Sequence, residues 1–126
     1  MTANEDLLEQ ARQAAARSYS PYSEFRVGAV AVAEDGSVFT GANVENAAYG
    51  SSVCAEANAI ATAAGSGVRS IPTIAVVCLD GDVCAPCGNC LQMMREFGVE
   101  RIIAEDGEHS FEELLPYSFG PEALGK

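Results

Sequence analysis

The chain has 126 residues, of which 48% are hydrophobic and 20% charged, a composition typical of one globular domain and not of a disordered chain. Its eighteen acidic and seven basic residues give a net charge of −11. The basic residues are scattered and no apolar run approaches the roughly 20 residues of a membrane span, so nucleic-acid and membrane partners are excluded. Residues 1–10 carry acids and no basic residue, which predicts that there is no signal peptide and that the protein is cytoplasmic.

Hydrophobic periodicity predicts eight elements. Leucines and alanines recur at helical spacing near the N-terminus, where Thr2 and Glu5 fit a capping box. A valine-rich run is followed by Asp35 and Gly36, a pair typical of a hairpin turn. In chain order we expect helix 3–17, strands 26–33 and 38–42, helix 53–64, strand 73–79, helix 88–97, strand 99–104 and helix 111–115.

The order of these elements predicts the fold class. The first two strands form an antiparallel hairpin, whereas strand–helix–strand units favour parallel pairing through right-handed crossovers. We therefore expect an α/β fold, a three-layer α/β/α sandwich with helices on both faces of one mixed sheet. A single domain is expected over residues 1–126.

The five cysteines cannot all pair in disulfides, and four of them lie within residues 78–90. Clustered cysteines in a chain without a signal peptide are more often metal ligands or redox groups. Cys54 is expected in the first turn of one helix, and Cys87 and Cys90 bracket the first turn of the next. If the strands before these helices are parallel, both helix N-termini emerge at one sheet edge, where ligands collect.

Three thiolates at one place suit a catalytic zinc ion, which keeps a fourth position for water and lowers the pKa of that water. Glu56 follows Cys54 by two residues and is close enough to move the proton of such a water. Cys-Ala-Glu at one helix start and Pro-Cys-x-x-Cys about 30 residues later form the signature of zinc deaminases.

The chain resembles the small, homotetrameric type of cytidine deaminase along nearly its whole length, which implies that the mixed sheet is of the five-strand type. The Asn-Val-Glu-Asn stretch is the most specific part, since it separates nucleoside deaminases from the wider deaminase superfamily. The motifs that carry the resemblance are Ser-Pro-Tyr-Ser at 20–23, Phe-Arg-Val-Gly at 25–28, Asn-Val-Glu-Asn-Ala-Ala-Tyr-Gly at 43–50, Val-Cys-Ala-Glu at 53–56, Pro-Cys-Gly-Asn-Cys at 86–90 and Ser-Phe-Gly-Pro-Glu at 118–122.

This resemblance implies an activity and a cofactor. Cys54, Cys87 and Cys90 would hold one Zn²⁺ per chain. Glu56 would pass a proton first to ring nitrogen N3 and then to the departing amine. Cytidine or 2′-deoxycytidine would lose ammonia by hydrolysis at C4 and become uridine or 2′-deoxyuridine, a step of pyrimidine salvage.

The resemblance also implies six residues that bind the nucleoside. Asn43 and Glu45 would hydrogen-bond the ribose 3′-hydroxyl, and Phe25 would pack against the pyrimidine. Tyr49 and Phe119 would reach the site of a neighbouring subunit, so the active site would need a homo-oligomer, expected to be a tetramer. The six residues are Phe25, Asn43, Glu45, Tyr49, Ala55 and Phe119.

Two positions depart from the family pattern. Ala57 and Leu91 stand where the family usually has arginines. The first of these arginines offsets thiolate charge in the three-cysteine type, so its loss predicts a weaker Lewis acid and slower turnover of cytidine. Ala57→Arg should then raise activity.

Other interpretations of the cysteines stay open. A closed four-cysteine site of Cys78, Cys84, Cys87 and Cys90 would be structural. We expect Cys78 in the core and Cys84 on a loop near the site, with redox exchange between Cys84 and Cys87 as a further alternative. His109, the only histidine, is expected on a surface loop.

Two other functions also remain. The chain could deaminate a cytosine nucleoside analogue, as blasticidin S deaminase does, because that family also lacks an arginine after Cys-Ala-Glu. It could instead be a relative that binds zinc or nucleosides without turnover. Comparing cytidine with blasticidin S as substrates tests the first alternative, and Glu56→Gln tests the second.

Overall fold

A computed structural model describes residues 3–126 and contains a five-stranded mixed sheet with strand order β2-β1-β3-β4-β5. The strands are β1 (Val27–Val32), β2 (Val38–Ala42), β3 (Thr73–Cys78), β4 (Arg101–Ala104) and β5 (Gly107–Ser110). The helices are α1 (Ala3–Ala15), α2 (Ala55–Gly65), α3 (Gly88–Glu96) and α4 (Phe111–Leu114), with 3-10 turns η1 (Tyr49–Ser51) and η2 (Pro121–Leu124).

The eight predicted elements are confirmed, each with its ends within two residues of the expected ones. The prediction for His109 was wrong, because this residue lies in β5, an edge strand that pairs antiparallel with β4. The predicted cap involves Thr2, which lies outside the described residues. Within residues 3–126, no helix has the length and apolar character needed to cross a membrane.

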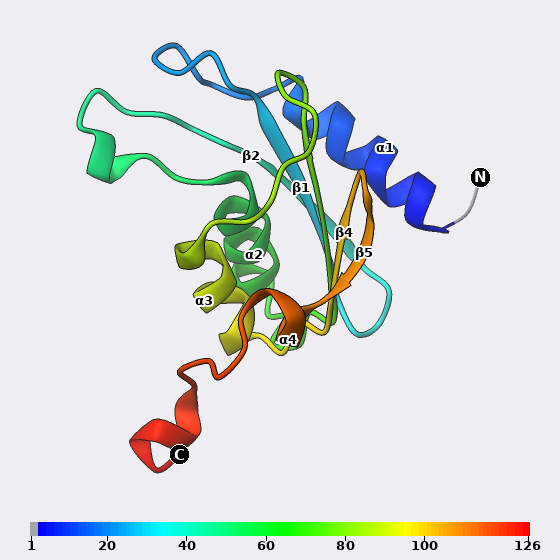
Figure 1. Ribbon diagram of the computed structural model, residues 1–126, viewed down its shortest axis with the longest axis vertical. Coiled ribbons are helices and arrows are strands. Elements are labelled where there is room, and N and C mark those ends of the chain that lie inside the picture. Colours follow the sequence, from blue (N-terminus) through cyan, green and yellow to red (C-terminus); the bar gives the residue numbers. More distant parts are fainter. Residues whose placement is uncertain (1–2) are drawn as a thin grey trace.

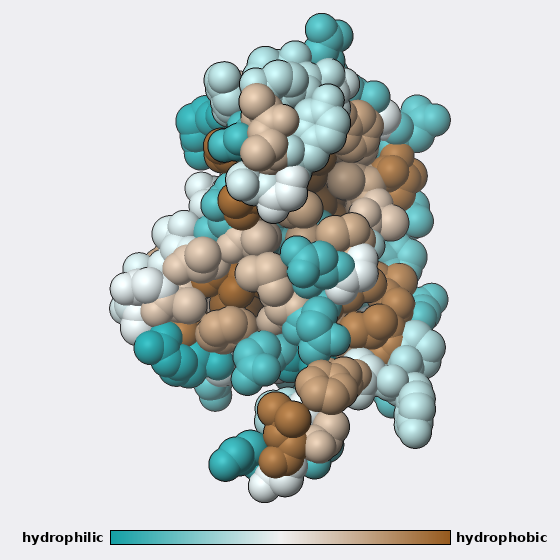
Figure 2. Space-filling view, turned by 90° about the vertical axis from the view of Figure 1, so that its left-hand side faces the viewer, coloured by the Kyte–Doolittle hydropathy of each residue, from teal (hydrophilic) through white to brown (hydrophobic). Residues whose placement is uncertain are grey.

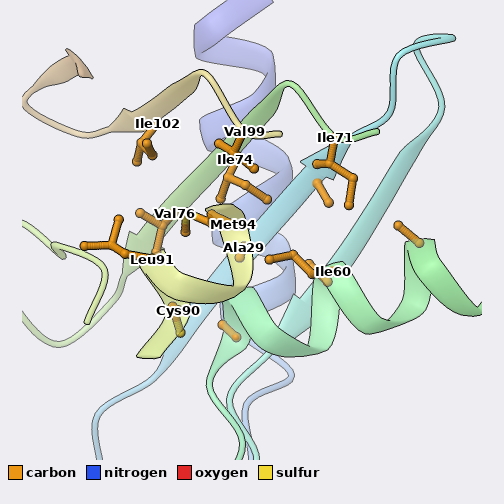
Figure 3. Close-up of a cluster of buried hydrophobic side chains, with 14 of the residues drawn as sticks. Ala29, Ile60, Ile71, Ile74, Val76, Cys90, Leu91, Met94, Val99 and Ile102 are labelled. Carbon is orange, nitrogen blue, oxygen red and sulfur yellow. The ribbon is translucent and has the colours of Figure 1, made fainter. Parts of the chain in front are cut away.

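Helices cover both faces of the sheet, which confirms the α/β/α sandwich. Figure 1 shows α1 on one face and α2 and α3 on the other. Alternate strand residues serve the two layers, as the period-two geometry of a strand requires. In β3, Ile74 and Val76 pack in the cluster of α2 and α3 (Figure 3), whereas Ala75 and Val77 pack in the cluster of α1.

The strand directions place the starts of α2 and α3 at one edge. β3 pairs with β4 in parallel, as expected, but β2 does not pair with β3. Instead β1 lies between them and is antiparallel to both, so β2 and β3 still run in the same direction. The helices that follow these two strands therefore begin at the same edge of the sheet.

Two glycines let helix backbones touch the sheet. A Cβ at Gly28 in β1 would overlap the backbone of α1 at Ala11 and Ala15. A Cβ at Gly41 in β2 would overlap the backbone of α2 at Ala55 and Ala59. Each face of the sheet thus has one close strand–helix contact that a larger residue would push apart.

Candidate metal and catalytic site

Three cysteine sulfurs converge where α2 and α3 begin. Cys54 is the residue before α2, Cys87 is the residue before α3, and Cys90 lies in the first turn of α3. Their Sγ atoms all lie within 4.8 Å of one another. Cys90 is buried at one end of the hydrophobic cluster between α3 and the sheet (Figure 3).

The pKa values of the three thiols are those of a site that a bound cation would stabilise. Burial raises the pKa of Cys54 and of Cys90, and the neighbouring acidic groups raise both pKa values further. Burial would also raise the pKa of Cys87. However, the backbone N–H of Cys90 and the two neighbouring thiols donate hydrogen bonds to its sulfur, and these bonds bring the pKa of Cys87 below its ordinary value. Three crowded sulfurs with one easily ionised member are a donor set that fits Zn²⁺, whose binding deprotonates thiols.

A buried carboxylate shares the space beside these sulfurs. Glu56 lies in the first turn of α2 and its residue exposure is only 4%. Burial raises the pKa of this carboxyl, which suits a group that both accepts and returns a proton. The common cavity has a volume of about 170 Å³ and is lined by Val27, Asn43, Cys54, Ala55, Glu56, Cys84, Ala85 and Cys87.

Asn43 is held firmly in this wall by the chain itself. Its Oδ1 accepts hydrogen bonds from Ser18 Oγ at 2.5 Å and from Val27 N at 2.9 Å. Its Nδ2 donates to the carbonyl of Phe25 at 2.8 Å. One N–H of the amide remains for a substrate, because the inventory of an asparagine side chain allows a second donor.

Glu45 and Tyr49 lie in a neighbouring depression of about 350 Å³, whose other lining residues are Tyr22, Ser23 and Ser52. The Glu45 carboxylate accepts hydrogen bonds from the backbone N–H groups of Tyr22 and Ser23, both at 3.0 Å, and from the Ser23 hydroxyl. The hydroxyl bond is the main reason that the pKa of Glu45 lies below its ordinary value. The Tyr49 ring meets Tyr22 edge-on at 6.1 Å and is 75% exposed.

The two predicted phenylalanines are outside the cavity. Phe25 precedes β1 and its ring lies against Gly81, where an added Cβ would approach it to 3.1 Å. Phe119 lies near the C-terminus and is 60% exposed. The structure therefore brings together Asn43, Ala55 and Glu56 with the cysteines, but not the two phenylalanines.

The other two cysteines, Cys78 and Cys84, are free thiols that lie next to each other and outside the triad. Cys78 is buried at the end of β3, as expected for a core residue. Cys84 lines the cavity from the loop before α3, and burial together with the neighbouring Cys78 raises the pKa of its thiol to about 12. Among residues 3–126, the sulfurs that lie close enough to share a metal ion are those of Cys54, Cys87 and Cys90, and not those of the alternative four-cysteine site.

The loop that leads to Cys87 is fixed by an ion pair that the sequence did not suggest. Asp80 accepts from the backbone N–H of Arg26 at 2.8 Å and from its guanidinium at 2.8 and 3.0 Å. These bonds lower the pKa of Asp80 to about 2. The one signal for Asp80 is its position just after a buried strand, at the edge where ligands gather.

Val27 and Ala85 also line the cavity without a motif to reveal them. Their contribution is shape alone, which no local pattern encodes. Ala57 and Leu91, the two departures from the family pattern, are both buried, each with 7% exposure. Leu91 packs in the hydrophobic cluster beneath α3.

The fold and site define a class of protein: an α/β/α enzyme whose metal-binding thiols and buried carboxylate meet at two helix starts. The family model of the cytidine and deoxycytidylate deaminase zinc-binding region matches residues 1–105, a range that contains all three cysteines. The chain belongs to this deaminase family.

Relatives and solved structures agree with this assignment. The cytidine deaminase of Halalkalibacterium halodurans is 40% identical over 94% of this chain and 95% of its own length, and that of Mycobacterium tuberculosis is 40% identical over 94% and 90%. A crystal structure of a mutant cytidine deaminase from M. tuberculosis has a TM-score of 0.90 at 37% identity, covering 98% of this chain and all of that one. The cytidine deaminase structure from Burkholderia pseudomallei has a TM-score of 0.85 at 41% identity, covering 94% and 100%.

Proposed function

We propose that this chain catalyses the hydrolytic deamination of cytidine and 2′-deoxycytidine to uridine and 2′-deoxyuridine, with release of ammonia. Zn²⁺, one per chain, is held by Cys54, Cys87 and Cys90. The observation that carries the proposal is the convergence of these three sulfurs, within 4.8 Å of one another, beside a cavity that is lined by two of them and by the buried Glu56.

Each group in the cavity has a role in this reaction. The metal ion, when bound, supplies a water of lowered pKa as the nucleophile. Glu56 accepts one proton of the attacking water and delivers it to N3 of the cytosine as the C4–O bond forms. It then takes the second proton, from the hydroxyl now on C4, and gives it to N4, so that the C4–N4 bond breaks and ammonia leaves. The burial of Glu56 supports this role, because it raises the pKa of the carboxyl toward the pKa values of the groups with which it exchanges protons.

The residues around the cavity bind the nucleoside. Asn43 donates its remaining N–H to the ribose 3′-hydroxyl, and Glu45 accepts from that hydroxyl. The Glu45 carboxylate has to share or exchange its bonds to the turn at residues 22–23 when substrate binds. Ala55 contacts the substrate from the start of α2. The contact of Phe25 with the pyrimidine rests on the resemblance alone, because its ring lies outside the cavity and against Gly81.

The site is completed by other copies of the chain in a homotetramer. Tyr49 and Phe119 support this proposal, because both are large aromatic side chains that one chain leaves mostly exposed. Each reaches the site of a neighbouring subunit. The single domain of residues 1–126 then acts in the cytoplasm, in pyrimidine salvage.

A substrate panel tests the proposed reaction. Purified protein with its zinc content measured is assayed for ammonia release from cytidine, 2′-deoxycytidine, cytosine and blasticidin S. We expect turnover of the two nucleosides and little of the free base, because Asn43 and Glu45 recognise the sugar. Turnover of blasticidin S alone supports the analogue-specific alternative, and no turnover with one zinc per chain supports a non-catalytic relative.

A further inference from the structure

The last eleven residues, 116–126, form an arm that extends from the body of the molecule (Figure 1). Tyr117 is fully exposed, and Phe119 and Leu124 are 60% and 67% exposed. In Figure 2 the arm lies below the body and presents strongly hydrophobic side chains to solvent. Three large apolar side chains on one short segment are a costly surface for a chain to leave uncovered.

The arm is nevertheless held to the body by polar contacts of one side chain. Arg95 donates from Nε to Ser118 Oγ at 2.9 Å and forms an ion pair with Glu122. The backbone of Gly120 lies close to both partners of this ion pair, since a Cβ there would overlap the guanidinium and Glu122 Oε1. Gly120 has extended backbone angles that any residue adopts, so the ion pair of Arg95 and Glu122 is the obstacle to a side chain at this position.

A second bond comes from the same helix. Gln92 Nε2 donates to the carbonyl of Phe119 at 2.9 Å. Both Gln92 and Arg95 are on α3, the helix whose start carries Cys87 and Cys90. One helix therefore holds two sulfurs of the metal triad at its beginning and the arm at its end.

We propose that Arg95 is a positioning residue that holds the arm ready to dock on a second copy of this chain. This inference rests on the proposed function in one respect, that the chain works as a homo-oligomer. Fixing the arm before association lowers the entropy lost on docking, which strengthens binding without adding a contact. The fork of an arginine suits this task because it holds Ser118 and Glu122 at once.

A second copy is the occupant that fits the arm. The chain exposes a further group of apolar side chains beside the cavity, which consists of Tyr22, Val44, Tyr49 and Val53. The net charge of −11 disfavours a polyanion or an anionic membrane as partner. Contact between apolar groups of two copies removes both from water.

The first test uses Arg95→Gln in the full chain, with Arg101→Gln as its matched control. Arg101 also forms an exposed ion pair, with Glu108 at 3.0 Å, but on β4 and away from the arm. We expect Arg95→Gln to raise the subunit dissociation constant about tenfold, measured by analytical ultracentrifugation, because an ion pair and a hydrogen bond are lost. Arg101→Gln should leave this constant within about twofold of the wild-type value.

A second variant keeps Arg95 and breaks its contact. Gly120→Ala places a methyl group against the guanidinium and should weaken association as Arg95→Gln does. In the Arg95→Gln background the same substitution should have a smaller effect than in the wild type, because the ion pair that the methyl group would disturb is already lost. Specific activity of both variants should fall on dilution and recover at high protein concentration, which simple unfolding does not produce.

The outcomes separate this inference from the proposed function. Unchanged dissociation constants in Arg95→Gln and Gly120→Ala, additive effects in the double variant, an equal loss in Arg101→Gln, or a wild-type monomer overturns the role of Arg95. A wild-type oligomer that weakens as expected but deaminates no cytosine nucleoside retains the role of Arg95 and overturns the proposed reaction.

Discussion

The two faces of the sheet are built alike but differ in chemistry. On one face α1 packs against Gly28, and on the other α2 packs against Gly41, in each case with the helix backbone touching the strand. The α1 face is filled by aliphatic side chains. The opposite face carries the three converging cysteines and Glu56.

The difference lies in how the helices are connected to the sheet. α2 and α3 follow β2 and β3, two strands of the same direction, and so both helices begin beside each other. α1 comes before β1, and its first turn lies beside the strands β4 and β5, where Asn4 hydrogen-bonds Glu108 and Arg101. The N-terminus of a helix stabilises anions. The N-termini of α2 and α3 lie side by side on one face of the sheet and together form a site for thiolates, whereas the α1 face, within residues 3–126, packs equally well but has no such pair of helix starts.

We expect the largest difference in activity when one glutamate on each face is replaced by the isosteric glutamine. Glu56→Gln removes the proton carrier and should lower kcat by about 10²- to 10⁴-fold while zinc content stays at the wild-type level. Glu9→Gln on α1 loses only an exposed ion pair with Arg12 and should keep full activity. Retained turnover in Glu56→Gln would contradict the assignment of the proton carrier to this face.

Cysteine substitutions sharpen the comparison within one face. Cys54→Ala removes a sulfur of the triad and should abolish stoichiometric zinc binding, measured by metal analysis of the dialysed protein. Cys78→Ala removes a buried sulfur outside the triad and should keep the zinc, with a loss of unfolding free energy of about 1 kcal/mol. Equal zinc loss in both variants would point to a different set of ligands.

The two glycines compare packing alone with packing that supports the site. Gly28→Ala and Gly41→Ala should each lower the free energy of unfolding by about 1–3 kcal/mol in denaturant titrations, because each forces a helix off the sheet. Only Gly41→Ala moves the start of α2, next to Cys54 and Glu56, so it alone should also lower zinc affinity and kcat. A similar loss of zinc affinity in Gly28→Ala would mean that the faces are not independent.

Charge compensation of the triad is tested at Ala57 on α2. Ala57→Arg should raise kcat by about tenfold if thiolate charge limits turnover, since groups around metal ligands have effects of this size. Ala57→Leu serves as the control of similar bulk without charge. A gain in both variants would attribute the effect to packing, and no gain in either would leave the missing arginine without consequence for rate.

The smallest effect is expected from the ion pair that fixes the loop before Cys87. Arg26 lowers the pKa of Asp80 to about 2, below the unfolded value of about 3.9, so the pair stabilises the fold above that value and loses its effect as the pH falls toward 2. Asp80→Asn should lower the thermal midpoint slightly at pH 7, and its difference from wild type should vanish near pH 2.

The matched control for Asp80 is Glu108, which pairs with Arg101 at the far edge of the sheet. Its pKa is also below the ordinary value, mainly because of Asn4 and Arg101. Glu108→Gln should lower the midpoint by a similar amount but leave zinc affinity unchanged, whereas Asp80→Asn should weaken zinc binding. Identical zinc affinities in the two variants would remove the role of Asp80 in the site.

The sequence predicted the elements that have strong hydrophobic periodicity and the meeting of the three cysteines with Glu56. It did not predict β5, because Gly-Glu-His-Ser has no apolar alternation and becomes a strand only by pairing with β4. Nor did it predict that β1 lies between β2 and β3, since pairing order is decided by tertiary packing.

At the site, the sequence could not show how polar side chains are already used. Asn43 and Glu45 are both in the specific motif, yet Asn43 faces the cavity while the Glu45 carboxylate is bonded to the turn at residues 22–23. The grip of Arg95 on the arm was equally hidden, because it joins residues 27 positions apart. Such contacts depend on where loops fold, which local patterns do not encode.

The most direct test is to titrate Zn²⁺ into metal-free protein while following the conversion of cytidine to uridine. If the triad and Glu56 form the active site, activity rises linearly to one zinc per chain and then stays constant, and Cys54→Ala shows no such rise. Full activity without metal, or one tightly bound zinc per chain without turnover of cytidine or 2′-deoxycytidine, would contradict the proposed function.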